Sequence, residues 1–329
     1  MHYIGSKINL TAFLITEIKN VVGDDLSSMI FCDLFAGSGA VGKAFKNEVK
    51  TLIANDLEYY SYLLNYTYLK SSLDLKKCEV YIHKLSGIAP REDGFILLHY
   101  TPQAKRNYFS IENAKRIDAM RLEIEKWFTC KEIDQDLYIF LLASLLSSAD
   151  KVANTASLYG AYLKELKKTA QEPLLLLPLD FVPSKNSNEV YNQDANDLIG
   201  RISGDILYLD PPYNHRQYGA NYHLLNTIAL YDSFEPKGKT GVRSYVSSSY
   251  CKKSEVYEKF EALIQDAKFT YIFVSYNEEG VMSQAQIQNI MSKYGSYSFV
   301  KKEHQRFKSY KKYKAKTYEH LHILVKEEI

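Results

Sequence analysis

The stretch "SMIFCDLFAGSGAVGKAFKNEVKTLIANDLE", residues 28–58, decides how the fold begins. Apolar residues run almost unbroken from 28 to 35 and stop at a glycine turn, as in a strand that is buried on both faces. "AVGKAFKN" (40–47) then has helical character, and "TLIANDLE" (51–58) has the pattern of a second strand that ends in acid. A strand, helix and strand in this order predict a parallel sheet with a right-handed crossover. We therefore expect an α/β fold.

The composition is that of an ordinary globular protein. The 329 residues are 46% hydrophobic and 24% charged, with a net charge of +2, enough for one large domain or a domain with a large insertion. The four cysteines are scattered without a CxxC pair, which argues against a disulfide framework and against a metal site. The apolar run at 137–146 is too short to span a membrane, and the first residues lack a signal-peptide pattern. We expect a soluble, cytoplasmic protein.

The middle of the chain is mostly helical. "SIENAKRIDAMRLEIEKWF" (110–128) has apolar residues at helical spacing with Ser110 as a cap, and a second helical region is expected from about Asp134 to Lys168. Strands resume in "NEVYNQDA" (188–195), "GDILYLD" (204–210), "TYIFVSYN" (270–277) and a closing pair joined by a basic turn. We therefore expect a sheet domain from 1–80 and 190–329, interrupted by a helical insertion at 81–189.

Acidic residues end the strands. In an open α/β sheet, ligands bind at the carboxyl ends of the strands, where Asp33, Asp56, Asp194 and Asp210 are predicted to lie. "DLFAGSGAVG" (33–42) has the glycine spacing of a dinucleotide site, but Asp33 would repel a pyrophosphate. The same carboxylate would attract the cationic amino-acid end of S-adenosylmethionine, while Asp56 is placed to accept both ribose hydroxyls. These features favour S-adenosylmethionine as the cofactor.

The stretch "LDPPYNHRQYGANYHLL" (209–225) carries the expected chemistry. The amino group of a nucleobase is a poor nucleophile because its lone pair is delocalised into the ring. Asp210 and a proline carbonyl can accept its two hydrogens and localise that lone pair, and Pro211 and Pro212 restrict the backbone that aims the carbonyl. Tyr213 offers a face for the base, worth about 1–3 kcal/mol of stacking. The pattern predicts methyl transfer from sulfonium to nitrogen, driven mainly by positioning.

"DLFAGSG" followed downstream by "DPPY" resembles the Dam-like, alpha-group adenine-specific DNA methyltransferases, and "YIGSK" (3–7) is similar to their N-terminal motif. The resemblance implies that Tyr3 and Lys7 contact the cofactor and that Asp194 lies near its adenine. It also implies that "FVSYNEEG" (273–280) lines the target-base pocket, through Ser275, Tyr276 and Asn277. The cofactor-binding residues so expected are Tyr3, Lys7, Asp33, Phe35, Gly37, Ser38, Gly39, Asp56, Asp194 and Asp210; the catalytic ones are Asp210, Pro211, Pro212 and Tyr213.

The resemblance covers nearly the whole chain and extends to a subset of restriction–modification methylases, several of which modify CATG. It implies a Rossmann-like methyltransferase sheet with 81–189 as the inserted target-recognition domain. We further expect a monomer that protects its site from a cognate restriction endonuclease, which shares that site but need not bind this chain.

Duplex DNA is the expected substrate, and its target adenine must be flipped out of the stack. Flipping the base out costs free energy, which contacts of Lys and Arg to phosphates help to offset. Polar side chains in the major groove read the base sequence. Asn107 is a further candidate for reading bases in the insertion. The DNA-binding residues predicted are Arg106, Asn154, Tyr159, Arg216, Arg306, Lys308, Lys311 and Lys312.

Other functions fit part of the pattern. [ND]PPY also occurs in methyltransferases that act on RNA bases or on protein glutamine amides, so the acceptor could differ while the cofactor stays the same. A DNA-binding regulator with an inactive methyltransferase fold is a non-enzymatic alternative, against which the intact Asp210 and Tyr213 speak. A NAD-dependent enzyme is the most distant alternative.

Overall fold

A computed structural model describes residues 7–278, 280–305 and 316–327, and the chain divides into two units. We call residues 7–57, 186–217 and 247–329 the sheet unit, and residues 58–185 and 218–246 the helical unit.

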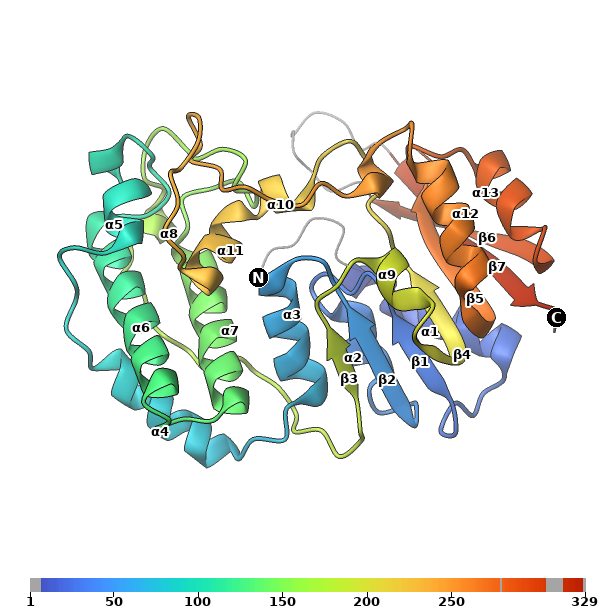
Figure 1. Ribbon diagram of the computed structural model, residues 1–329, viewed down its shortest axis with the longest axis horizontal. Helices are drawn as coiled ribbons and strands as arrows, with labels where there is room; N and C mark the ends of the chain where they lie inside the picture. Colours follow the sequence, from blue (N-terminus) through green and yellow to red (C-terminus); the bar gives the residue numbers. More distant parts are fainter. Residues whose placement is uncertain (1–6, 279, 306–315, 328–329) are drawn as a thin grey trace. The chain divides into compact units, whose positions relative to one another are not determined.

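The sheet unit contains a sheet whose described part has seven strands, in the order β3-β2-β1-β4-β5-β7-β6 (Figure 1). The first five run parallel, whereas β7 is antiparallel to both β5 and β6. The strands are β1 (Ile30–Asp33), β2 (Thr51–Asn55), β3 (Glu189–Tyr191), β4 (Ser203–Leu209), β5 (Lys268–Asn277), β6 (Gly295–Gln305) and β7 (Lys316–Lys326). The predicted α/β sheet is confirmed.

Helices cover both faces of this sheet because its central strands are apolar on both sides. Phe31 of β1 stacks on Phe45 of α2 with ring centroids 4.3 Å apart, whereas its neighbour Cys32 belongs to the core on the opposite face. The helices beside Phe31 are α1 (Thr11–Val22), which follows the 3₁₀ turn η1 (Lys7–Leu10), and α2 (Ala40–Phe45). The opposite face carries α9 (Ala195–Ile199), η4 (Ser249–Cys251), α12 (Val256–Asp266) and α13 (Gln284–Met291).

The helical unit is built around two long helices, α6 (Ile111–Thr129) and α7 (Gln135–Val152). Ser110 caps α6, as predicted, by accepting a hydrogen bond from the Asn113 N–H. Shorter helices surround them: α3 (Tyr59–Asn65), the π-helical turn η2 (Tyr66–Lys70), α4 (Leu75–Ser86), α5 (Phe95–His99), η3 (Pro102–Ala104), α8 (Lys168–Gln171), α10 (Tyr218–Asn221) and α11 (His223–Leu230).

The helical unit is larger than the predicted insertion, since it begins at residue 58 rather than 81 and also includes 218–246. Side-chain contacts of α3 explain the difference. The Asn226 amide donates to Glu58 Oε2 at 2.6 Å and its oxygen accepts from the Tyr60 N–H at 2.9 Å. The buried rings of Tyr60 and Tyr222 lie 5.5 Å apart. These contacts join α3 to α11, although more than 150 residues separate them in the sequence.

The second predicted helix is shorter than expected, because α7 ends at Val152 rather than near Lys168. Asn154 is fully buried; its amide donates to the carbonyls of Asn107 and Leu163, and its oxygen accepts from the Lys167 N–H. These side-chain bonds satisfy backbone groups that a continuing helix would have used.

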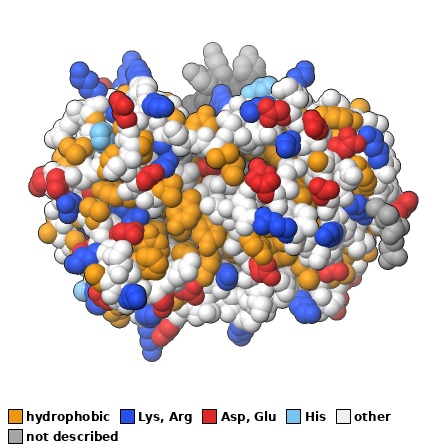
Figure 2. Space-filling model, viewed as in Figure 1, with side chains coloured by type: hydrophobic (Ala, Val, Ile, Leu, Met, Phe, Trp, Pro, Cys, Tyr) orange, Lys and Arg blue, Asp and Glu red, His pale blue; other side chains and the backbone are white. Residues whose placement is uncertain are grey.

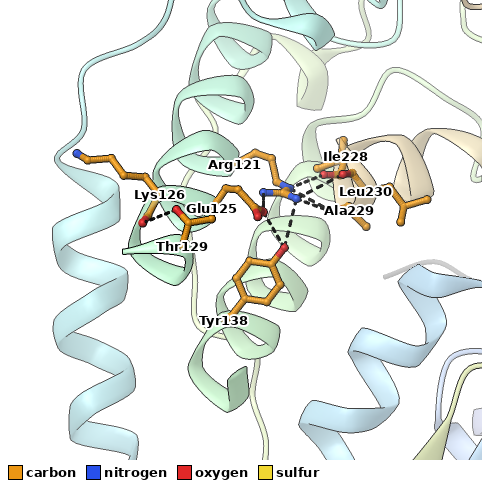
Figure 3. Close-up of polar contacts among 8 residues, drawn as sticks. All are labelled: Arg121, Glu125, Lys126, Thr129, Tyr138, Ile228, Ala229 and Leu230. Carbon is orange, nitrogen blue, oxygen red and sulfur yellow. Dashed lines mark hydrogen bonds and ion pairs between the residues drawn. The ribbon is translucent and has the colours of Figure 1, made fainter. Parts of the chain in front are cut away.

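Arg121 on α6 anchors the end of α11 (Figure 3). Its guanidinium is buried and donates to the carbonyls of Ile228, Ala229 and Leu230, the orphan acceptors at a helix C-terminus. Glu125 completes the arrangement with an ion pair of 2.8 Å to the guanidinium. The cation therefore also complements the negative end of the α11 dipole.

A groove lies beside this cluster. Tyr59, Tyr138 and Leu230 are among its lining residues, and Figure 2 shows hydrophobic side chains gathered where α3 and α7 lie. None of the helices in the described part of the chain combines the length and the apolar character needed to cross a membrane.

Candidate active site

Three carboxylates meet at the carboxyl edge of neighbouring strands in the sheet unit. Asp33 is the last residue of β1, Asp56 follows the end of β2 and Asp210 follows the end of β4. Because β1 lies between β2 and β4, these positions are adjacent. The clustering predicted from the strand-end acids is therefore present for these three residues.

The glycine turn after β1 needs glycine at two positions. Gly37 and Gly39 have φ angles of 50° and 75°, in the left-handed region that other residues rarely adopt. The Gly37 N–H donates to Asp56 Oδ2 at 2.7 Å, which ties the turn to the end of β2. The turn thus holds backbone close to the three carboxylates.

Asp33 is buried, with 1% of its surface exposed, and its Oδ1 has no hydrogen-bond partner among the described residues. Burial, with the nearby charges of Asp210 and Asp56, raises the pKa of Asp33 to about 8, against a smaller lowering by the Gly42 N–H. A buried acceptor oxygen without a donor is a site for a cation or a hydrogen-bond donor.

Asp210 lies against Lys7, whose Nζ is 3.0 Å from Asp210 Oδ1 and 2.8 Å from Glu319 Oε1 on β7. Burial lowers the pKa of Lys7, but the two carboxylates outweigh it and raise that pKa well above its usual value. For Asp210, burial and Glu319 raise the pKa and Lys7 lowers it, with a net rise to about 6. Asp210 is therefore mostly ionised at neutral pH.

Tyr213 stands beside this cluster. Lys7 Nζ is 5.7 Å from the centre of its ring, and the ring meets Tyr276 edge to face at 6.0 Å. The Tyr213 carbonyl accepts from the Val281 N–H at 2.9 Å, which fixes the backbone just after Pro211 and Pro212. A half-buried aromatic ring held next to the partly buried carboxylate of Asp210 suits a flat, polar ligand such as a nucleobase.

The parallel sheet with a reversed β7, the glycine turn and the Asp-Pro-Pro-Tyr turn together define a methyltransferase of amino nitrogens. A family model described as D12 class N6 adenine-specific DNA methyltransferase matches residues 3–299. The chain belongs to this family: it is an adenine-specific DNA methyltransferase, and its methyl donor is S-adenosylmethionine.

Individual relatives are similar over most of the chain. The type II methyltransferase M.NlaIII of Neisseria lactamica is 56% identical, with 99% of each chain covered. M.FokI of Planomicrobium okeanokoites is 40% identical over 96% of this chain, which spans 51% of that longer protein. M.CviAII of Paramecium bursaria Chlorella virus 1 is 39% identical, covering 93% of this chain and 92% of the relative.

The remaining predicted cofactor residues lie in the same unit. Asp194 caps α9 by accepting from the Asn196 N–H. Phe35 packs edge to face on Tyr250 with centroids 5.1 Å apart. The orphaned Asp33 oxygen fits the ammonium of the methyl donor, and Asp56 follows the next strand, where ribose hydroxyls were expected. These roles remain predictions, supported by the placement of the side chains.

Among the predicted base-pocket residues, Ser275 and Tyr276 are buried at the end of β5. The Ser275 hydroxyl donates to Glu319 Oε1, and the Tyr276 hydroxyl accepts from the Met282 N–H at 3.2 Å. Asn277 ends the strand and is paired in register with Glu319. Ser275 therefore joins the carboxylate cluster and Tyr276 supports Tyr213.

Two residues predicted to read DNA bases lie in the interior of the helical unit. Asn154 and Tyr159 are fully buried in the helical unit, and the Tyr159 hydroxyl donates to Asp150 at 2.8 Å. This burial argues against their predicted role as base readers. Arg106 is also engaged internally, donating to the carbonyls of His99, Pro236 and Gly238. These polar residues form hydrogen bonds inside the helical unit, and the local sequence does not distinguish such internal contacts from contacts to DNA.

Tyr3 and the basic residues Arg306, Lys308, Lys311 and Lys312 lie outside the described residues. Arg216 is exposed after the Asp-Pro-Pro-Tyr turn.

The sequence did not predict that Glu319 belongs to the site. The available signal was weak: a glutamate within an apolar strand, close to His320 and His322. Within the described ranges, His, Cys, Asp and Glu form no group of three or more that could hold a metal.

We predict that Asp33→Asn weakens binding of S-adenosylmethionine about 10- to 150-fold, since a hydrogen bond to a charged group contributes about 1.5–3 kcal/mol. In the wild type, Asp33 with its pKa of about 8 must lose a proton to pair with the ammonium. Affinity should therefore rise about tenfold per pH unit from pH 6 toward 8. Calorimetry measures both effects.

The matched control is Asp205→Asn, the same change at the start of β4, where Asp205 accepts from the Ile30 N–H. Its affinity for the cofactor should stay within about twofold of the wild type, as for sites away from a ligand. Equal affinities of the Asp33→Asn variant and the wild type would contradict the assignment.

Proposed function

We propose that this chain methylates the N6 amino group of an adenine that is flipped out of duplex DNA, within one short sequence. The observation that carries the proposal is Asp210, held at the end of β4 by Lys7 and followed by Tyr213. Its relatives named type II methyltransferases support a place in a restriction–modification system. The earlier resemblance makes CATG the first sequence to test.

In this proposal Asp210 and a proline carbonyl accept the hydrogens of the amino group, which localises the nitrogen lone pair. Tyr213 stacks on the base, and Asp210, whose pKa is about 6, is the acceptor placed to take the proton that the nitrogen releases once it carries the methyl group. When bound, S-adenosylmethionine supplies an activated methyl carbon. Asp33 would hold its ammonium and Asp56 its ribose, next to the glycine turn.

Contacts to DNA are proposed in two places. Arg216 is exposed three residues after Tyr213, where a guanidinium could bind a phosphate near the flipped nucleotide. The helical unit, enlarged by 58–80 and 218–246, is proposed to read the sequence. We also propose that the chain acts as a monomer, in the cytoplasm where its DNA lies. A cognate endonuclease would share its recognition sequence without binding it.

Expression in a host that lacks DNA methylation tests the function directly. We expect sequencing of the host DNA to show N6-methyladenine in one short sequence, at nearly every copy, with CATG the first candidate. The Asp210→Ala variant should leave the genome unmodified. Labelled methyl groups found in RNA or protein but absent from DNA would overturn the proposal, and modification at another sequence would overturn the CATG assignment alone.

A further inference from the structure

Glu319 brings a second carboxylate, itself buried, to Lys7 from β7. Because β7 runs antiparallel to β5, its early residues lie at the edge where the parallel strands end, and Glu319 pairs in register with Asn277. Side chains alternate between the faces of a strand, so Glu319 shares its face with Ser275 and Tyr208. This face is the one that η1 and Lys7 approach.

The contacts of Glu319 hold its carboxylate in one position. It is 3% exposed, its Oε1 lies 2.8 Å from Lys7 Nζ, and the same oxygen accepts from the buried Ser275 hydroxyl. Lys7, itself 5% exposed, thus lies between Glu319 and Asp210. Few rotamers remain open to a buried lysine with two anionic partners, so its ammonium position is defined.

We infer that Glu319 is a positioning residue for methyl transfer: it shares the ammonium of Lys7 with Asp210, so that Asp210 is oriented while its carboxylate remains a stronger hydrogen-bond acceptor for the adenine amino group than it would be in a pair with Lys7 alone. This inference rests on the proposed function. Glu319 itself touches neither the base nor the methyl donor in this account.

The charge balance explains how sharing the Lys7 ammonium between two carboxylates favours Asp210 as an acceptor. With Asp210 alone, Lys7 would form a neutral pair and weaken the acceptor; with Glu319 added, the three groups carry a net charge of −1. Burial and Glu319 raise the pKa of Asp210 to about 6 against the effect of Lys7. Within the described residues, the other titratable groups whose charges act on this cluster are Tyr208, Tyr213 and Asp33, with Asp56 beyond Asp33; His320 follows Glu319 in β7 but points to the opposite face of the strand.

The test is Glu319→Gln, which keeps an oxygen for Lys7 and Ser275 but removes the charge. Single-turnover methylation at pH 7.5 should fall about tenfold, the effect of about 1.4 kcal/mol. The acid limb of the pH–rate profile should move down by about one pH unit, because Asp210 loses a like charge beside it. The dissociation constant of S-adenosylmethionine should change less than the rate does.

Two variants serve as controls. Glu319→Asp keeps the charge and should restore the acid limb toward the wild-type value. Glu327→Gln makes the same chemical change at an exposed position just after β7, and should leave the rate and the profile unchanged. A fall in rate and melting temperature by Glu319→Gln without movement of the acid limb would overturn the inference, leaving Glu319 a structural role only.

A second readout does not depend on turnover. The Asp210 carboxyl carbon, labelled with ¹³C, can be titrated by NMR in the wild type and in Glu319→Gln. A lower pKa of Asp210 in the variant supports the linkage, and an unchanged one overturns it. If the wild type methylated no adenine, the proposed function would fail, while this titration would still decide whether Glu319 raises the pKa of Asp210.

Discussion

Asp210→Ala is expected to lower the rate of methyl transfer by about 10²–10³-fold or more, the loss seen when one preorganised hydrogen-bonding group is removed from an active site. Alanine removes the acceptor that localises the lone pair of the amino nitrogen, while Tyr213 and the prolines keep their backbone. Single-turnover assays with saturating DNA and labelled S-adenosylmethionine measure the chemical step directly. DNA affinity should stay close to that of the wild type.

Two comparisons separate chemistry from folding. Asp197→Ala makes the same change at an exposed position of α9 and should leave the rate within about twofold of the wild type. Asp210→Asn keeps one acceptor oxygen, and because [ND]PPY turns occur in related chemistries, we expect it to retain more activity than alanine. Turnover of Asp210→Ala near the wild-type rate would defeat the mechanism.

The sequence predicts those residues of the site whose position depends on a local sequence pattern. Asp33, Asp56 and Asp210 could be placed together because each follows a recognisable strand, and parallel strands end at one edge. Gly37 and Gly39 marked the turn because their φ angles exclude most other residues. These features depend on a few neighbouring residues, so the sequence alone contains them.

Interactions between distant segments were not predictable in the same way. The ion pair of Lys7 with Glu319 joins residues more than 300 positions apart and depends on the reversal of β7. Asn154 and Tyr159 had the chemistry of base readers, but packing made them internal. The early start of the helical unit likewise follows from Asn226 bonding to Glu58 and Tyr60. In each case, tertiary contacts overrode the local pattern.

Lys7→Met should destabilise the protein by about 3–5 kcal/mol at pH 8, because it leaves the buried carboxylate of Glu319 and the partly buried carboxylate of Asp210 without their cation. Methionine keeps much of the side-chain volume, so charge is the main change. Urea denaturation followed by circular dichroism measures the free energy of unfolding. Lys19→Met is the control: its partner Glu48 is exposed, and such pairs contribute about 0–1 kcal/mol.

The pH dependence of the stability loss in Lys7→Met shows whether its cause is electrostatic. Without Lys7, the folded-state pKa of Asp210 should rise further above its unfolded value, and a carboxyl raised in this way costs stability at pH values above its folded pKa. The cost is relieved as pH falls toward the unfolded value, so the deficit of Lys7→Met should shrink between pH 8 and pH 5. The double variant Lys7→Met, Glu319→Gln should recover part of the loss at pH 8, since one buried charge is removed. A deficit of equal size at both pH values would instead point to lost packing of the lysine chain, and the shared cation would then have no part in holding Asp210.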